Sequence, residues 1–269
     1  MSEGLTQGFN IIRTVSVSVA FNPSSYFTGG TAGPTYDFNS SANILNGSAT
    51  AATNGQTIAT VKDSNAGSFD ATQGTDANRP TLVTSYLNGK SVALSDSTDV
   101  FDTISGLNTF TNAANSVCVV AVVRPIDGTA NHTIWKCFDN GFSEQRIYAG
   151  FTGLQPTIAY SRDAVNYGNA RFGTAVTADT WNVLIYQIDA LNGQTGVYMN
   201  DGTNLTMQAA GGSTVAGAWA ATNGTGSTLM LTSKMRLAMV YVHKNAFPDS
   251  TQRTNLFAAA KSAYNLSTY

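Results

Sequence analysis

Carboxylates and histidines are the residues whose spacing would reveal an enzyme. Glycosidases use two carboxylates, one as nucleophile or base and one as acid. The 269-residue chain has only Glu3 and Glu144 as glutamates, outside any Glu-x-Asp-x-x-Glu pattern, and only His132 and His243 as histidines. His-Glu-x-x-His, Gly-x-Ser-x-Gly, phosphate-loop and Cys-x-x-Cys motifs are absent from the sequence. We therefore expect no enzyme and no catalytic residue; a hydrolase that uses an aspartate pair is the open alternative.

Several aspartates are spaced so that they could hold a cation. Asp96, Asp99 and Asp102 lie three residues apart, and Asp63 and Asn65 form an earlier group. Oxygen ligands of this kind bind Ca²⁺. Asp and Asn also cap turns, which explains the same residues without a metal. We therefore predict no cofactor and assign no metal ligand, with Ca²⁺ as the alternative.

A group of aromatic and polar residues lies in predicted loops that are rich in Gly and Ala. An aromatic face can stack on a sugar ring, while neighbouring polar groups fix the hydroxyls. The candidate carbohydrate-binding residues are Tyr160, Arg162, Asp163, Tyr167 and Trp219. Packing against a neighbouring subunit or against the rim of the chain's own fold is the explanation that we favour.

The composition limits the partners. Charged residues make up 11% of the chain and the formal net charge is -2, whereas roughly a quarter of the residues are charged in ordinary soluble domains. The sequence offers no basic field for nucleic acid and no polybasic patch for anionic lipid. The apolar run 117–123 is far shorter than the roughly 18 residues of a membrane span. We expect neither nucleic acid nor membrane as a partner.

The N-terminus and the cysteines indicate the cellular compartment in which the protein is made. The first ten residues carry Glu3 and no basic segment, and no continuous apolar stretch follows. We therefore expect no secretory signal and synthesis in the cytoplasm. Cys118 lies inside an apolar run, far along the chain from Cys137. This placement predicts two buried free thiols rather than a disulfide or a metal site.

The elements that must position these residues are mostly short strands. Residues 181–188 and 117–123 are aromatic or branched on both faces, which is typical of strands buried in the middle of a sheet. The pair Asn192-Gly193 predicts a tight reversal, after which residues 196–200 return as a hairpin partner. Similar Asn-Gly and Asp-Gly pairs recur along the chain. Many short strands with tight reversals predict one all-β domain, an antiparallel sandwich or barrel.

The C-terminal part adds a strand and the one predicted helix. Residues 235–243 form a late strand. We expect Pro248 to be the first helical residue, with Asp249 in the positive first turn. Apolar residues then recur at helical spacing up to Tyr264. This helix should pack against the sandwich.

The N-terminal segment has the pattern of an arm. Four apolar residues alternate with small polar ones, as in a half-buried strand, and residues 28–34 have the Gly- and Pro-rich composition of a linker. We therefore divide the chain into an attachment arm, 1–34, and a body domain, 35–269. An exposed apolar stripe would promote aggregation of a lone subunit. We expect assembly contacts, in a homo-oligomer that is most simply a trimer or dimer, at Val15, Val17, Val19 and Phe21.

Several segments of the body, taken in order, carry a resemblance to a known family. They are residues 54–63, 70–73, 79–81, 87–90, 181–184, 197–202, 237–241 and 264–266. Together they resemble the concanavalin A-like, laminin-G-like domains found in bacterial and phage proteins. The resemblance implies a two-sheet jelly-roll sandwich; by itself it does not imply carbohydrate binding. Met239 stands where the late strand of such domains commonly carries an acidic residue.

These expectations combine into a phage-type virion structural protein without enzymatic activity: a capsid decoration, fibre or tail component. It would be an all-β jelly-roll sandwich with an N-terminal arm and one C-terminal helix. We expect it to be made in the host cytoplasm and located in the virion, with other virion proteins as partners and cell-surface glycans as a further ligand. A carbohydrate-binding, lectin-like module is the first alternative and a glycoside hydrolase the second.

Overall fold

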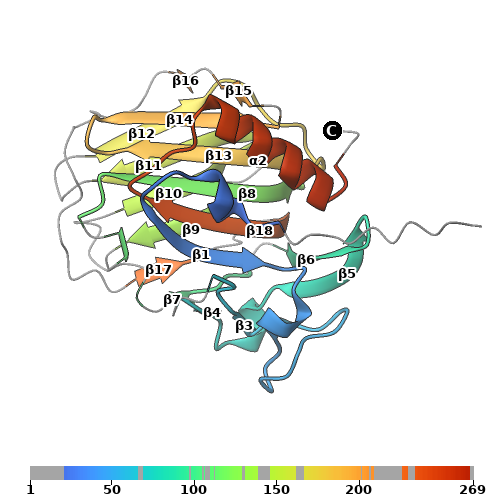
Figure 1. Cartoon of the computed structure of the whole chain (residues 1–269). Helices are drawn as coiled ribbons and strands as arrows, with labels where there is room; N and C mark the ends of the chain where they lie inside the picture. Colours follow the sequence, from blue (N-terminus) through green and yellow to red (C-terminus); the bar gives the residue numbers. More distant parts are fainter. Residues whose placement is uncertain are drawn as a thin grey trace, which may run out of the picture.

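The computed structural model describes residues 21–65, 69–96, 98–104, 106, 110–111, 113–128, 131–138, 146–161, 167–200, 202–205, 207–208, 226–229 and 234–266. Within these residues every pairing between strands is antiparallel. Two large sheets enclose one core, and a smaller third sheet lies beside them (Figure 1). The predicted all-β antiparallel two-sheet sandwich is confirmed. The third sheet was not predicted.

The larger sheet has eight strands in the described part of the chain, with β8 and β18 near its centre. In spatial order its strands are β15 (Thr203–Asn204), β14 (Gln194–Met199), β13 (Asn182–Asp189), β8 (Ser116–Pro125), β18 (Met235–Lys244), β6 (Lys90–Ser95) and β5 (Thr81–Leu87), and β1 (Thr31–Asp37) also pairs with β18. The turn between β5 and β6 contains Asn88 and Gly89, whose φ angles of 49° and 86° suit a two-residue hairpin.

The central strand β8 is apolar on both faces because both faces are covered. Val119 and Ala121 belong to the core between the two large sheets, whereas Val120 and Val122 belong to a second cluster on the outer face. The C-terminal helix covers this outer face (Figure 1). The buried central strands predicted at 117–123 and 181–188 are therefore confirmed, and Trp181 is buried as expected.

The second large sheet closes the other side of the core. Its strands are β16 (Met207–Gln208), β12 (Tyr167–Phe172), β11 (Gln155–Ser161), β10 (Arg146–Thr152), β9 (Asn131–Phe138) and β17 (Gly226–Thr228). The third sheet is made of two-residue strands: β2 (Ile44–Leu45), β3 (Thr60–Val61), β4 (Ala71–Thr72) and β7 (Thr103–Ile104). Short 3-10 helices are η1 (Pro23–Tyr26), η2 (Ser41–Asn43) and η3 (Asp76–Asn78).

The helix α2 (Ser250–Ala263) lies on the outer face of the larger sheet. Asp249 is its N-cap: the Asp249 carboxylate accepts the Gln252 backbone N–H, and the Gln252 side-chain oxygen accepts the Asp249 backbone N–H. The helix is confirmed, but Pro248 precedes the cap and is not the first helical residue. None of the described helices is long and apolar enough to cross a membrane. Cys118 and Cys137 are both buried, and they do not form a disulfide with each other.

The strand β1 begins inside the predicted linker. Thr31 pairs with Lys244 and Tyr36 with Val240, so β1 is a member of the larger sheet. The backbone approaches β18 so closely that a Cβ on Gly30 would come within 2.5 Å of the Lys244 carbonyl oxygen. Thr31 and Ala32, which we assigned to the arm, are therefore paired with β18 in the body, and Gly33 and Pro34 belong to the same strand.

Candidate functional site

A pocket of about 500 Å³ lies at the edge of the larger sheet, along the hairpin of β13 and β14. This volume falls within the roughly 300–1,000 Å³ of small-ligand sites. Polar side chains form one part of its wall and aromatic rings another. The lining residues on which the site depends are Gln187, Asp189, Gln194, Gly196, Tyr198 and Phe247.

The register of the hairpin brings the polar groups together. Gln187 and Asp189 lie two residues apart on β13, so their side chains leave the same face of the sheet. Gln187 pairs with Gly196 across the hairpin, and Asp189 pairs with Gln194. The reversal contains Gly193, whose φ of 66° is readily adopted by glycine. The turn chemistry predicted from the sequence therefore sets which side chains meet in the pocket.

Gly196 keeps the space beside Gln187 open. A side chain at the cross-strand position would lie about 4.5–5.5 Å from the Gln187 Cβ. Among the described residues, a Cβ built on Gly196 would meet the Tyr198 ring alone, at 3.8 Å. The glycine is therefore not required by close packing, and its effect is to leave room in the pocket.

The pocket offers both hydrogen-bond donors and acceptors. Asp189 accepts the Asn192 backbone N–H at 3.1 Å and the Asn192 side-chain N–H at 2.7 Å, one on each carboxylate oxygen. Each oxygen keeps acceptor capacity, because a carboxylate has about four lone-pair sites. The amide nitrogen of Gln187 is buried and has no hydrogen-bond partner among the described residues. A buried donor in this state costs about 1–3 kcal/mol, and a ligand oxygen would remove that cost.

The aromatic part of the wall is held in place by packing. Tyr198 and Phe247 are partly buried against the outer cluster below α2. The guanidinium carbon of Arg253 lies 4.0 Å from the centroid of the Tyr198 ring. Arg253 is itself fixed, because it donates to the Pro248 carbonyl oxygen at 2.8 Å. The Tyr198 ring is therefore a preformed surface at the pocket.

The structure describes two of the predicted sugar-binding residues, Tyr160 and Tyr167. Tyr160 is on β11 with 1% of its surface exposed, inside the core between the sheets, so the expectation that it lies in a surface loop is wrong. Burial raises the pKa of Tyr160, and the nearby Asp189 carboxylate adds to the rise. Tyr167 is on strand β12. Arg162, Asp163 and Trp219 lie outside the described residues.

Of the four residues predicted to form the assembly stripe, the structure describes one, Phe21. Phe21 is partly buried on the outer cluster of its own chain, with its ring centroid 6.3 Å from that of Tyr26 and 6.4 Å from that of Tyr264. The other three predicted assembly residues, Val15, Val17 and Val19, lie outside the described residues. The described end of the arm therefore contacts the body.

The aspartates considered for Ca²⁺ make bonds within turns. Asp99 accepts the Asp96 backbone N–H at 3.0 Å, and Asp63 accepts the Asn65 backbone N–H at 2.9 Å. Burial raises the pKa of Asp99 to about 6. Asp102 is exposed. In the described part of the chain no group of three or more His, Cys, Asp or Glu side chains is placed to hold a metal ion.

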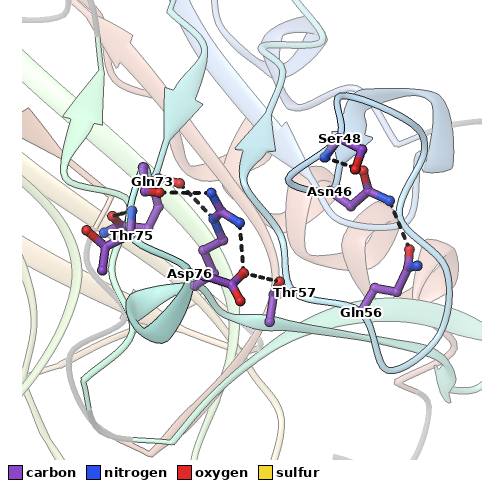
Figure 2. A network of polar contacts seen from close by, with 9 residues as sticks. Asn46, Ser48, Gln56, Thr57, Gln73, Thr75 and Asp76 are labelled. Carbon is purple, nitrogen blue, oxygen red and sulfur yellow. Dashed lines mark hydrogen bonds and ion pairs between the residues drawn. The ribbon is translucent and has the colours of Figure 1, made fainter.

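A separate polar network fixes loops around the third sheet (Figure 2). Arg79 bonds the Asp76 carboxylate at 2.7 Å and donates to the Gln73 carbonyl oxygen at 2.9 Å. Asp76 also accepts the Thr57 hydroxyl at 2.9 Å. Gly47 leaves room for this arginine, because a Cβ there would come within 2.6 Å of the guanidinium. Arg79 is one of the residues that carry the family resemblance. Its contacts in this network give it a structural role.

Sequence reasoning missed the pocket residues although it located their hairpin. Gln187 is a polar residue within the apolar run 181–188, and this interruption is the signal that could have identified it. Gly196 sits directly across from it in the hairpin register. Phe247 joins them only through the tertiary fold, since it follows β18 far along the chain. No periodic pattern in the sequence predicts that Phe247 lies beside the hairpin.

No protein-family model matches the chain, and no curated protein matches it. Solved structures do match. A GH54 α-L-arabinofuranosidase soaked with a cyclic sulfate inhibitor is 12% identical, with 86% of this chain and 62% of that chain covered and a TM-score of 0.55. This chain thus spans less than two thirds of the length of that enzyme.

Two further solved structures show weaker likeness. Domain 4 of AbnA, a GH43 extracellular arabinanase from Geobacillus stearothermophilus, in complex with arabinotriose, is 14% identical, with 85% of this chain and 99% of that chain covered and a TM-score of 0.46. The binding domain of botulinum neurotoxin serotype C1 is 13% identical, with 70% of this chain and 50% of that chain covered and a TM-score of 0.44.

These comparisons correct one expectation. From the missing glutamate pair we predicted that the chain is not an enzyme, and that prediction is wrong: the GH54 chains, which share the fold at a TM-score of 0.55, are glycosidases. The absence of a Glu-x-Asp-x-x-Glu pattern therefore does not decide whether a chain with this fold is an enzyme. At 12% identity the likeness shows the fold alone. The chain has a β-sandwich fold that it shares with carbohydrate-active proteins.

Proposed function

We propose that the chain is a carbohydrate-binding, lectin-like β-sandwich protein whose binding site is the pocket along β13 and β14. One observation carries the proposal. The pocket combines an aromatic wall at Tyr198 with the buried amide of Gln187 and the carboxylate of Asp189. A sugar has apolar ring faces and many hydroxyls, so it matches a site with both kinds of surface.

The solved structures support the same class of ligand, whereas the resemblance to concanavalin A-like, laminin-G-like domains bears on the fold. The solved structures with a TM-score of 0.55 are arabinofuranosidases, one of them soaked with 4-nitrophenyl α-L-arabinofuranoside. Those ligands belong to those proteins, and they supply the first probes for this chain.

Titration calorimetry with arabino- and xylo-oligosaccharides tests the proposal. Gln187→Ala and Tyr198→Ala should each weaken binding by about tenfold, which corresponds to ~1.4 kcal/mol. Leu191→Ala is the matched control, because Leu191 is 47% exposed at the tip of the same hairpin and does not line the pocket. This control should bind like the unmodified chain. Equal affinity in all three variants would show that sugars bind elsewhere.

The same oligosaccharides test for hydrolysis. Cleavage of a glycosidic bond by two carboxylates needs a second carboxyl group about 5–10 Å from Asp189. Release of reducing ends that is lost in Asp189→Asn would assign cleavage to this pocket. Binding without release would limit the role of the pocket to recognition.

The virion structural role is a second proposal, favoured by the apolar stripe that ends at Phe21. The role includes other virion proteins as partners, a homo-oligomer and a location in the virion. Because β1 begins at Thr31 and Phe21 packs on the body, the arm that can be removed safely is residues 1–20. Deleting residues 1–20 should leave a folded chain that no longer assembles. Electron microscopy and light scattering would check this, and unchanged assembly would contradict it.

A further inference from the structure

We propose that the pocket along β13 and β14 selects neutral sugars over acidic ones. This inference rests on the proposed carbohydrate-binding function and adds the class of ligand. It follows from the hydrogen-bonding capacity and the charge of Gln187, Asp189 and Gln194, which line the pocket.

The amide of Gln187 requires an acceptor on the ligand. Its nitrogen is buried without a hydrogen-bond partner among the described residues. The terminal torsion of a glutamine side chain is soft, so the amide can turn to meet a ligand oxygen. A sugar hydroxyl supplies such an oxygen.

The carboxylate of Asp189 requires a donor on the ligand. Its two oxygens are held in place by the backbone and side-chain N–H groups of Asn192. A second carboxylate would place like charges side by side, which costs free energy in a partly buried site. No Lys, Arg or His is among the described residues that line the pocket, and the guanidinium of Arg253, on the Tyr198 ring, donates to the Pro248 carbonyl oxygen. An acidic sugar is therefore repelled.

Neutral hydroxyls suit both groups. One hydroxyl can donate its hydrogen to the Asp189 carboxylate, and another can accept a hydrogen from the Gln187 amide through a lone pair. The two side chains lie on the same face of β13, two residues apart, or about 7 Å along the strand. Different hydroxyls of one sugar can therefore contact both. An ionised carboxylate on the ligand has no hydrogen to donate to Asp189.

Matched ligands test the selection. Titration calorimetry would compare galactose with galacturonate oligosaccharides of equal length, beside the arabino- and xylo-oligosaccharides. The best neutral sugar should bind at least about tenfold more tightly than any acidic one. An acidic sugar that binds as tightly as the best neutral one would overturn the selection while leaving carbohydrate binding intact. If no sugar of any class binds, the proposed function itself fails.

A charge placed in the pocket gives a second test that does not disturb the fold. Gln194 is exposed where it lines the pocket, so Gln194→Lys should raise affinity for galacturonate by about two- to fivefold, the size of an exposed ion pair. The gain should shrink in high salt. Leu191→Lys adds the same charge outside the pocket and should have no such effect. Equal gains in both variants, or none in Gln194→Lys, would contradict the charge argument.

Discussion

Gly150 on β10 leaves no space for a side chain. A Cβ on this residue would overlap the backbone oxygen of His132 on the neighbouring strand and come within 2.8 Å of the Tyr148 hydroxyl. That hydroxyl donates to the carbonyl oxygens of His132 at 3.2 Å and Phe151 at 3.0 Å. The absence of a Cβ therefore lets Tyr148 bridge the two strands.

Gly150→Ala should lower the free energy of unfolding by about 3 kcal/mol, because backbone or side chains must move to admit the methyl group. Gly196→Ala is the matched control: its nearest contact would be at 3.8 Å, and we expect a change below about 1 kcal/mol. Urea denaturation followed by circular dichroism would measure both. Equal losses would contradict the packing described for Gly150.

His243 is a buried histidine at the contact between β1 and β18. Its ring stacks on Phe27 with centroids 4.2 Å apart, and its nitrogens lie 2.6 Å from the Tyr241 hydroxyl and 3.0 Å from the Gly29 carbonyl oxygen. Burial lowers the pKa of His243, and the bond to Gly29 acts weakly in the opposite direction. The unfolded chain therefore binds this proton more readily than the folded protein does.

The folded protein should lose stability when the pH falls below about 6.5, the ordinary pKa of histidine. Above that pH both states are neutral at His243 and its contribution is fully present. The variant His243→Gln should show a smaller drop in unfolding free energy between pH 8 and pH 5 than the unmodified chain. Denaturant titrations across this range would measure the two slopes. Identical slopes would mean that His243 is not the group that titrates.

At the level of single elements, the start of α2 depends on two reciprocal bonds. The Asp249 carboxylate and the Gln252 amide each accept the backbone N–H of the other residue at 2.8 Å. Asp249→Ala should cost about 1 kcal/mol, since it removes the acceptor for a helix N–H. Thr251→Ala, at an exposed position of the same turn, is the control and should change stability by less than 0.5 kcal/mol. Thermal unfolding would check both.

The long elements could be predicted from the sequence and the short ones could not. Strand β8 was recognisable because a run of branched residues covered on both faces is rare outside a central strand. The strands of the third sheet have two residues each, as at Ile44–Leu45. Two residues carry no periodicity, so their pairing is decided by the tertiary fold. The same limit applies to the pocket, where Phe247 meets Gln187 only after α2 and the hairpin have been placed.

At the scale of the whole molecule, the third sheet shares the core of the sandwich. Ile44 of β2 and Ile104 of β7 belong to the same apolar cluster as Val119 of β8. We therefore expect calorimetry to show one cooperative transition, with equal calorimetric and van't Hoff enthalpies. Ile44→Ala should cost about 2–5 kcal/mol and move that single transition to lower temperature. A second, separate transition would mean that the third sheet unfolds alone.

The position of β18 has a consequence for how the protein is made. β18 pairs with β8 on one edge and with both β6 and β1 on the other, although it ends only at Lys244 of 269 residues. On the ribosome, β1 and β6 emerge long before the strand that joins them to β8. Until β18 is released, the nascent chain exposes an open edge and the apolar faces of β8, a state in which chains tend to associate. The fold can therefore close only after all the other described strands have been made, and the yield of native protein depends on keeping neighbouring nascent chains apart until then.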